Sequence, residues 1–480
     1  MDNYGNDVYK SPFCSRYSSK EMLYIFSQEK KIITWRKLWV ALARAEKELG
    51  LPISSSQIKE LEDNVDIIDY EIAKKREKIV KHDVMAQIYS YATQCKNAAK
   101  IIHLGATSCY VTDNASIIIM REGLYLIKRK LLGVIKLLSN FAFKTRKIPC
   151  LSYTHLQPAQ LSTVGKRAAL WLQDFYMDFV ELSRIIENLV LLGSKGATGT
   201  QASFLELFKK DKKKVKLLEE KITKEMGFSK VIYLSGQTYS RKIDFNICCI
   251  LSSIAQSAMK FSGDMRILQG FKELEEPFEE NQVGSSAMPY KRNPMKSERV
   301  TALSRYVITN LLNPSMTAAT QWFERTLDDS ANRRIVIPES FLAIDAILNI
   351  LINICGGIVV NKKIIENKVL EELPFMATEN IMMEATKKGG NRQKIHEILR
   401  KLSIETANNI KKYGKENDLI KKLEEEKTLN LSREELKTII KPENFIGLSV
   451  EQVENFLNDV INPILKENEK EIIDKFELLV

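Results

Sequence analysis

Proline and glycine are scarce in this chain, with 12 and 20 of 480 residues, whereas apolar residues make up 44%. A disordered chain would be poor in apolar residues, and a fibrous or low-complexity chain would be rich in glycine or proline. Both classes are therefore excluded. The length is sufficient for a large core and for more than one domain.

Cysteine and histidine are also rare. The seven cysteines are odd in number and scattered, and neither they nor the four histidines have the spacing of metal ligands. This pattern is typical of reduced thiols in a cytoplasmic protein. We therefore predict a cytoplasmic location and a protein that needs no metal and no other cofactor.

Long apolar runs are absent as well. No uninterrupted apolar run reaches the roughly 18 residues that a membrane-spanning helix needs. The first residues, MDNYGNDVYKSPFCSRYSS, lack the apolar centre of a signal peptide. We expect no membrane partner.

The charge is unbalanced, because Lys and Arg outnumber Asp and Glu by 72 to 61, which gives a net charge of +11. The cations are spread along the chain, so they indicate a lysine-rich solvated surface that also attracts anions. No recognition motif for nucleic acid accompanies them, and we do not expect a nucleic acid as a partner.

Helical periodicity is what the chain does have. In TWRKLWVALARAEKELGLP, Trp35, Leu38 and Leu42 share one face of a helix, and Gly50 and Pro52 end the segment. This pattern predicts an amphipathic helix that packs on a core.

Five longer helical patterns follow, and they contain no proline and little glycine: 114–146, 165–192, 241–269, 297–312 and 339–360. A helix of the second pattern would be about 42 Å long at 1.5 Å per residue. Helices of that length need partners along their whole apolar face. A bundle provides such partners, and an oligomeric bundle provides them best.

We therefore predict an all-α fold with three helical domains. They are an N-terminal domain at 1–107, a central long-helix bundle at 108–360 and a Lys/Glu-rich C-terminal domain at 361–480. No strand alternation and no internal repeat is evident. The chemistry is expected in the polar stretches that interrupt the helices.

Two of the four histidines have surroundings that suggest chemistry. His103 and His396 resemble ordinary structural residues. His155, in SYTHLQPAQ, is flanked by hydroxyl and amide side chains that can orient an imidazole, and Pro158 leads into the long helix. A histidine fixed at the mouth of a bundle is a natural general acid or base near neutral pH. His82, between a lysine and an aspartate at the expected start of a helix, could hold an anion.

The most distinctive stretch is GSSAMPYKRNP, from Gly284 to Pro294. It is too polar and too rich in turn residues for a core, which favours a functional loop. Its two serines, Met-Pro and Lys-x-Asn-Pro stand in the register of the fumarase/aspartase superfamily, whose signature it closely resembles. Members of that superfamily eliminate fumarate from succinyl compounds. HLGATS and SYTHLQPAQ resemble the other two signature regions, in the expected order.

Further motifs resemble one branch of the superfamily, the adenylosuccinate lyase family, in the form typical of animals and their relatives. They are CSRYSS, KHDVMA, GQTYSRK and QWFERTLDDSANRR. The resemblance extends from about Ser15 to the C-terminus. One departure is Lys81, where the family often has arginine, so that the charge is kept and the two-pronged donor is lost.

The resemblance implies a function. The family releases fumarate from adenylosuccinate, giving AMP, and from the succinylated ribotide SAICAR, giving AICAR. Ser285 lines up with the general base and His155 with the general acid. Serine is a poor base, so it needs help from donors along the loop, from Lys291 and from exclusion of water on closure, for which Gly284 supplies flexibility. His82 belongs to the same catalytic group.

The resemblance also implies substrate-binding residues: Arg16, Tyr17, Lys81, His82, Asp83, Thr107, Ser108, Gln237, Asn293, Arg299, Arg325, Ser330 and Arg334. The arginines suit the phosphate and carboxylates of a nucleotide substrate. Ser330 and Arg334, four residues apart, share a helix face. Family members are homotetramers, and each active site takes residues from three subunits.

Two alternatives remain. One is another fumarate-releasing lyase of the superfamily, such as argininosuccinate lyase, against which the phosphate-type arginines count. The other is a basic helical scaffold or nucleic-acid binder that has lost catalysis, against which Ser285, His155 and Lys291 count. Turnover of adenylosuccinate would count against both alternatives. Salt-sensitive binding of nucleic acid without turnover would favour the second alternative.

Overall fold

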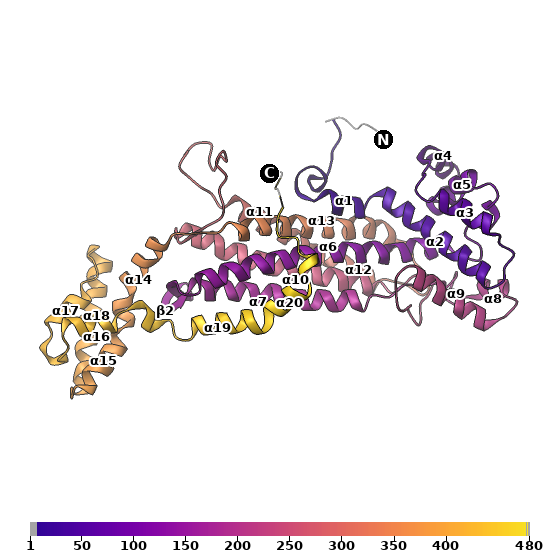
Figure 1. Ribbon diagram of the computed structural model, residues 1–480. Coiled ribbons are helices and arrows are strands. Elements are labelled where there is room, and N and C mark those ends of the chain that lie inside the picture. The colour runs from indigo at the N-terminus through magenta and orange to yellow at the C-terminus, as the bar shows by residue number, and fades with distance from the viewer. Residues whose placement is uncertain (1–6, 477, 479–480) are drawn as a thin grey trace.

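The computed structural model describes residues 7–476 and 478, and it shows an elongated bundle of helices (Figure 1). Residues 1–6, the start of the stretch that was expected not to be a signal peptide, lie outside the described residues. So do residues 477, 479 and 480, at the end of the predicted C-terminal domain.

Five long helical runs that alternate in direction form the centre of the bundle. They are α6 (Ser108–Thr145), α7 (Val164–Glu187), α10 (Lys242–Gly270), α11 (Met295–Asn310) with its continuation α12 (Leu312–Ala319), and α13 (Asp328–Gly356). The prediction of five long helices is confirmed. The last begins earlier than predicted and continues through Pro338, which removes one helical hydrogen bond. Packing of α13 against α6, α10 and α11 holds it there.

The N-terminal helices begin on the side of this bundle, with η1 (Phe13–Tyr17) and α1 (Lys20–Ile25), and then cover one of its ends. The helices that follow are α2 (Gln28–Glu48), α3 (Ser55–Asp63), α4 (Tyr70–Val80), α5 (Asp83–Gln94) and η2 (Ala99–Ile101), with α8 (Ala202–Leu207) and α9 (Lys212–Glu225) beside them. In α2 the side chains of Trp35, Leu38 and Trp39 are buried, as the periodicity predicts. Gly50, with φ of 98°, ends the segment.

The C-terminal helices form a small group with a core of its own. They are α14 (Lys362–Met376), α15 (Thr378–Lys387), α16 (Arg392–Tyr413), α17 (Leu419–Glu425), η3 (Lys427–Leu429), α18 (Arg433–Ile439) and η4 (Pro442–Phe445). Ile381, Leu419 and Leu436 are among the residues of this second core. The three predicted domain boundaries stay a prediction.

The chain then returns along the bundle in α19 (Ser449–Phe456), η5 (Leu457–Ile461), α20 (Asn462–Glu467) and η6 (Glu469–Glu471). Arg146 Nε lies 2.6 Å from Glu454 Oε1, and the rings of Tyr176 and Phe456 pack with centroids 6.3 Å apart. The last helices therefore pack on α6 and α7 instead of extending the small C-terminal group.

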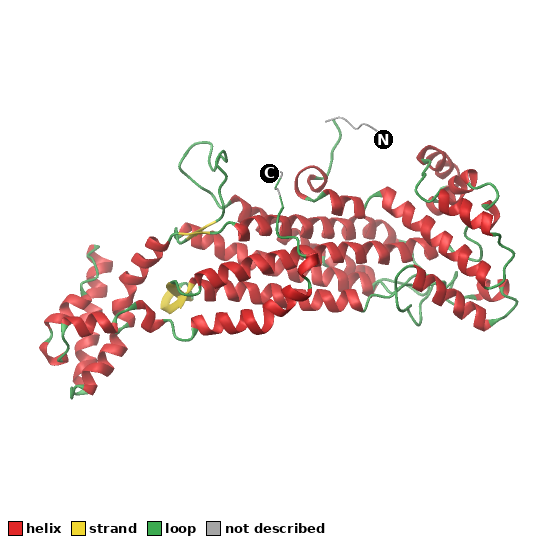
Figure 2. Ribbon diagram, viewed as in Figure 1, coloured by secondary structure: helices red, strands yellow, loops and turns green. Residues whose placement is uncertain are grey.

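Within the described part of the chain, four short strands interrupt the helices, and Figure 2 shows them in yellow. β1 (Pro149–Thr154) and β2 (Gln157–Thr163) form an antiparallel hairpin, and β3 (Leu274–Glu275) pairs with β4 (Val359–Val360). The prediction that the chain has no strand is therefore wrong here, although the fold is mostly helical. Pro158 lies within β2, and the long helix begins only at Val164.

Among the described residues, one helix, α13, is long and apolar enough by length and composition to cross a membrane. Of its most apolar window, 83% is buried inside the structure. This burial is typical of the central helix of a folded bundle, where every face of the helix meets another helix.

Candidate active site

The bundle has two ends, and the connections between its helices alternate between them. The 38 residues of α6 span about 57 Å at 1.5 Å per residue. Thr107 and Ser108 lie where α6 begins, near α5, and the β1–β2 hairpin with His155 follows shortly after α6 ends (Figure 1). We call these the α5 end and the hairpin end.

Four of the predicted site residues interact at the α5 end. His82 caps α5, and its Nδ1 accepts a hydrogen bond from the N–H of Met85 at 3.4 Å. Its Nε2 lies 3.4 Å from Ser108 Oγ. Since Nδ1 accepts, the proton of the neutral ring is on Nε2, facing Ser108. Arg334 Nη2 donates to Asp83 Oδ2 at 2.9 Å, which brings α13 to the same place.

Gln237 is held at the α5 end from three sides. Its N–H donates to the carbonyl oxygen of Glu324 at 2.9 Å, and its Nε2 donates to that of Ala197 at 3.0 Å. Cys109 Sγ donates to its Oε1 at 3.3 Å. Arg325 directly follows Glu324, so the same loop contact brings this arginine to the α5 end.

Two further predicted residues, Lys81 and Ser330, lie at this end. Lys81 is exposed in a left-handed conformation, with φ of 54°, between α4 and α5. Ser330 lies in the first turn of α13, half-buried, one turn before Arg334 as the spacing predicted.

A buried ionic network fixes the α5 end, and the sequence analysis missed it. Arg241 donates to Asp113 Oδ2 at 3.0 Å and to Asp329 Oδ2 at 2.7 Å, and Arg333 donates to Asp244 Oδ2 at 2.6 Å. Arg241, Asp113 and Asp329 are each less than 5% exposed. The network joins the first two turns of α6, α10 and α13. Its signal in the sequence was a set of charged residues at helix starts, inside otherwise apolar patterns.

His155 lies at the tip of the β1–β2 hairpin. The register pairs Thr154 with Gln157, so His155 and Leu156 are the two central residues of the turn, with φ of 55° and 57°. Such turns favour Asn-Gly, and a left-handed residue other than glycine costs about 1 kcal/mol or more. Both side chains are exposed. The fold thus holds an exposed imidazole in a strained turn.

The signature loop precedes α11 and stands away from the bundle (Figure 1). Ser285 Oγ accepts hydrogen bonds from the N–H groups of Ala287 at 3.3 Å and Met288 at 3.1 Å. Asn293 Nδ2 donates to the carbonyl oxygen of Gly284 at 2.8 Å. A Cβ on Gly284 would overlap with the backbone oxygen of Lys291, so glycine is required here because the loop folds back on itself.

The base of the signature loop is adjacent to the hairpin. Tyr153 Oη donates to Glu273 Oε1 at 3.2 Å, and its ring packs on Phe271 with centroids 5.6 Å apart. Ser285, Lys291 and Asn293 therefore belong to the hairpin end, as His155 does.

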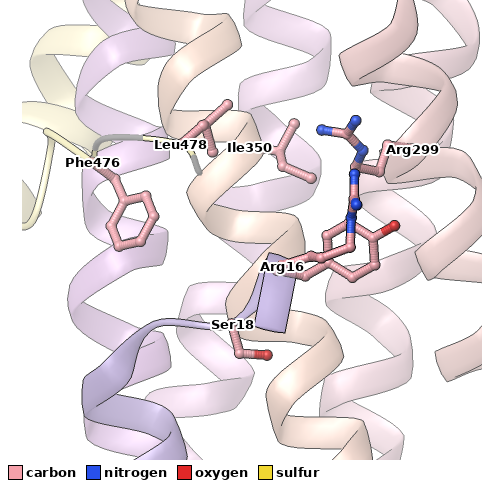
Figure 3. A pocket seen from close by; sticks show the side chains of 7 residues that line it. Arg16, Ser18, Arg299, Ile350, Phe476 and Leu478 are labelled. Atoms are coloured by element: carbon pink, nitrogen blue, oxygen red, sulfur yellow. The ribbon is translucent and has the colours of Figure 1, made fainter. Parts of the chain in front are cut away.

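A small pocket on the side of the bundle, which we call the side pocket, is lined by three further predicted residues: Arg16, Tyr17 and Arg299 (Figure 3). The guanidinium carbon of Arg299 lies 5.8 Å from the ring centroid of Tyr17. Ser19 anchors this segment, since its N–H donates to Asp345 Oδ2 of α13 at 2.6 Å.

Within one chain, the predicted site residues therefore lie in three separate regions. The α5 end holds Lys81, His82, Asp83, Thr107, Ser108, Gln237, Arg325, Ser330 and Arg334. The hairpin end holds His155, Ser285, Lys291 and Asn293, and the side pocket holds Arg16, Tyr17 and Arg299. Within residues 7–476 and 478, no group of three or more His, Cys, Asp or Glu side chains could hold a metal ion.

His103 has the structural role expected of it. Trp39 Nε1 donates to its Nδ1 at 3.0 Å, and burial, together with the charge of His82, lowers the pKa of His103 to about 4. The unfolded chain has an ordinary histidine pKa of about 6.5, so between pH 6.5 and 4 only the unfolded chain binds this proton.

This pKa difference predicts acid sensitivity. The stability that His103 contributes is complete above pH 6.5 and is lost as the pH falls to 4, by about 3 kcal/mol in free energy of unfolding. Urea unfolding at several pH values should show a flatter profile for His103→Gln than for the wild type. His396→Gln, at an exposed position of α16, should keep the wild-type profile. Equal slopes in all three proteins would contradict the assignment.

Comparison with known proteins shows which protein families this chain resembles. Residues 11–309 match the family model described as lyase, and residues 374–456 match the one described as adenylosuccinate lyase C-terminus. The chain is 48% identical over 478 residues to adenylosuccinate lyase of Saccharomyces cerevisiae, which covers 99% of each chain. It is 44% identical over 467 residues to that of Schistosoma mansoni, covering 97% of each.

A solved structure supports the fold. The crystal structure of a fumarate lyase from Mesorhizobium sp. BNC1 superimposes with a TM-score of 0.78 at 23% identity, covering 94% of this chain and 99% of that one. At this identity the likeness concerns the fold alone. The motifs predict the form typical of animals and their relatives, and the relatives reported above are a fungal and an animal protein.

Proposed function

The chain belongs to the adenylosuccinate lyase family, and on that basis we propose that Ser285 and His155, from different subunits, are the base and the acid of its reaction. The near full-length identity to relatives of that name establishes the activity. The chain is an adenylosuccinate lyase, a carbon–nitrogen lyase of purine biosynthesis. The roles of its residues are the proposal.

The proposed substrates are adenylosuccinate, which gives AMP and fumarate, and SAICAR, which gives AICAR and fumarate. In both, a base removes a proton from the succinyl carbon beside a carboxylate, and an acid protonates the departing nitrogen. The intermediate carbanion needs cations and hydrogen-bond donors at that carboxylate. A net charge of +11 favours the approach of such anions.

Contacts of Ser285 support its role as the base. Two backbone N–H groups, those of Ala287 and Met288, donate to its Oγ. Donors that point at an oxygen stabilise its charged form and lower its pKa. Lys291, on the same loop, adds a positive charge, and closure of the loop removes water from the alkoxide.

The strained turn supports His155 as the acid. A hairpin of this length would be more stable with Asn-Gly at the turn, so His155 and Leu156 are kept against the local preference. Strain of this kind gathers at functional sites, because the surrounding structure holds a residue where the chemistry needs it. The exposed ring can enter a site formed by another subunit.

The α5 end and the side pocket are the proposed binding sites for the rest of the substrate. Ser108 and Gln237, with Thr107 and His82, would hold the succinyl carboxylates. Arg325, Ser330 and Arg334 would hold the phosphate, together with Arg16 and Tyr17 of another subunit, and Arg299 would hold a carboxylate or a neighbouring group. Lys81, Asp83 and Asn293 would support these groups.

We also propose a homotetramer with shared active sites, and one observation, the length of α6, supports it. The α5 end and the hairpin end of one chain are separated by about 57 Å, the length of α6. No substrate of nucleotide size spans that distance. A complete site therefore requires other subunits whose bundles run in the opposite direction.

Mixing two inactive variants tests this sharing. Ser285→Ala and His155→Ala, dissociated together and reassembled, should regain activity, because in random hybrids about a quarter of the sites receive an intact serine and an intact histidine. The assay is the fall in absorbance of the purine band on addition of adenylosuccinate. If each site belonged to one chain, the mixture would stay as inactive as its parents.

Ser285→Ala mixed with Lys291→Ala is the matched control. Both changes lie in the signature loop, so one subunit supplies both residues to a site. This second mixture should not exceed the activity of its parents. Recovery in both mixtures would mean that reassembly alone restores turnover, and it would remove the support for shared sites.

The two alternative functions are set aside. The family model matched by residues 374–456 is that of adenylosuccinate lyase, which counts against the argininosuccinate branch, and the 48% identity over almost the whole chain to an adenylosuccinate lyase counts against a scaffold without catalysis. The cytoplasmic location stays a prediction, supported by free thiols at all seven cysteines.

A further inference from the structure

The C-terminal tail, which we define as residues 472–476 and 478, lies along α6 and ends at the side pocket. The N–H of Ile473 donates to the carbonyl oxygen of Arg129 at 3.1 Å. Phe476 and Leu478 line the pocket together with Arg16 and Arg299. Nothing in the proposed function uses this tail.

The tail is in direct backbone contact with α6 at Gly133. A Cβ at this position would overlap with the carbonyl oxygen of Ile473 and lie 3.2 Å from Cα of Asp474. Lys136 Nζ lies 2.7 Å from Asp474 Oδ2 and closes the contact on the side toward solvent. Only glycine at position 133 permits the tail to pack this closely against α6, and we call this contact the seat of the tail.

A chain of contacts leads from the tail to the segment of Arg16 and Tyr17. The ring of Phe476 lies 5.1 Å from Lys130 Nζ. Lys130 forms an ion pair with Asp345, and these side chains are 2% and 0% exposed. Asp345 accepts hydrogen bonds from Ser19, both from its N–H and from its hydroxyl.

The pocket has two chemically different sides (Figure 3). Arg16 and Arg299 lie on one side and Phe476 on the other, with Leu478 and Ile350 between them. The cavity has a volume of only about 10 Å³, so one chain supplies no more than one edge of a nucleotide site. Two guanidinium groups opposite an apolar surface suit such an edge, because a nucleotide combines an anionic phosphate with a flat base and a ribose.

We propose that the C-terminal tail is a wall of the nucleotide-binding pocket. Phe476 and Leu478 supply its apolar side, and through Lys130, Asp345 and Ser19 the tail keeps Arg16 and Tyr17 in position. This inference rests on the proposed function, in which Arg16 and Tyr17 bind the nucleotide and Arg299 binds a carboxylate or a neighbouring group of the substrate. The tail therefore determines affinity for the nucleotide part of the substrate and leaves the rate of bond cleavage unchanged.

Gly133→Ala tests the inference without substituting any residue of the tail or of the pocket. The added methyl group displaces Ile473, so we expect KM for adenylosuccinate to rise about tenfold with kcat within about twofold of the wild type. The dissociation constant of AMP, measured by calorimetry, should rise by the same factor. Gly356→Ala is the control, because a Cβ there meets only Leu137 at an ordinary contact distance of 3.9 Å. It should change neither quantity.

Phe476→Ala gives a second test in case Gly133→Ala does not fold. It should weaken AMP binding as Gly133→Ala does, and Phe476→Leu should restore most of the affinity because it restores an apolar wall. Unchanged AMP affinity in Gly133→Ala and Phe476→Ala would overturn the inference. Tighter binding would overturn it too, since the tail would then be an obstacle to the nucleotide.

Failure of the inference can be told apart from failure of the proposed function. Turnover by the wild type that depends on Ser285 supports the proposed function whatever the tail variants do. If turnover does not depend on Ser285, the proposed catalytic role fails, while the AMP measurements still decide whether the tail is part of the pocket.

Discussion

Ser285→Ala should lower kcat for adenylosuccinate by a factor of about 10²–10⁴, because that is the usual contribution of a general base to the rate. The substrate should still bind, since its anionic groups are held by other residues, so KM should change much less than kcat. The absorbance of the purine band measures both parameters. The fold should be preserved, because Ser285 lies in the projecting signature loop and its hydroxyl accepts hydrogen bonds from two neighbouring N–H groups of that loop.

Ser286→Ala is the matched control for this prediction. Ser286 is the exposed neighbour of Ser285 in the same loop. Its replacement should leave kcat within about tenfold of the wild type, below the range of a lost base. Loss of turnover in Ser286→Ala together with full activity in Ser285→Ala would assign the base to the second serine.

Arg241→Met should lower the free energy of unfolding by about 3–5 kcal/mol, because it leaves buried carboxylates without their partner. Arg241 is 1% exposed and donates to Asp113 and Asp329, which are 2% and 4% exposed. Methionine fills much of the volume, so the loss reflects charge more than packing. Urea unfolding measures it.

Two further variants separate charge from shape in this network. Adding Asp113→Asn and Asp329→Asn to Arg241→Met removes the unpaired charges and should recover a substantial part of the lost stability. Arg184→Met removes an exposed arginine paired with Glu181 and should cause no measurable change. Equal stability of the single and the triple variant would show that the ionic network contributes little.

Apolar periodicity was sufficient to predict the long helices, because each must bury one face along its whole length. The hairpin was missed because its turn carries His155 and Leu156 in place of Asn-Gly, so the usual signal of a two-residue turn is absent. The helix predicted at 339–360 starts too late, because α13 begins at Asp328 and continues through Pro338, where tertiary packing overrides the lost hydrogen bond.

The site residues were predicted from the resemblance to family motifs. Physical reasoning from the sequence alone could not have predicted that they belong to one site. Ser108 and His155 are separated by the length of α6 within one chain, so local patterns contain no information about their meeting. Arg241 and Asp113 were missed for a different reason. In a sequence, a buried charge pair looks the same as two solvated charges, and only the structure shows that they are covered.

The length of α6 has a consequence for how this chain can vary. Each residue of a helix adds about 1.5 Å and about 100° of rotation. A single insertion before Gly133 would turn the seat of the tail away from Ile473 and would also shift the hairpin relative to the start of the helix. Substitutions of side chains in α6 can therefore be tolerated, whereas changes in the number of its residues cannot. Natural insertions and deletions should be confined to the connections outside α6.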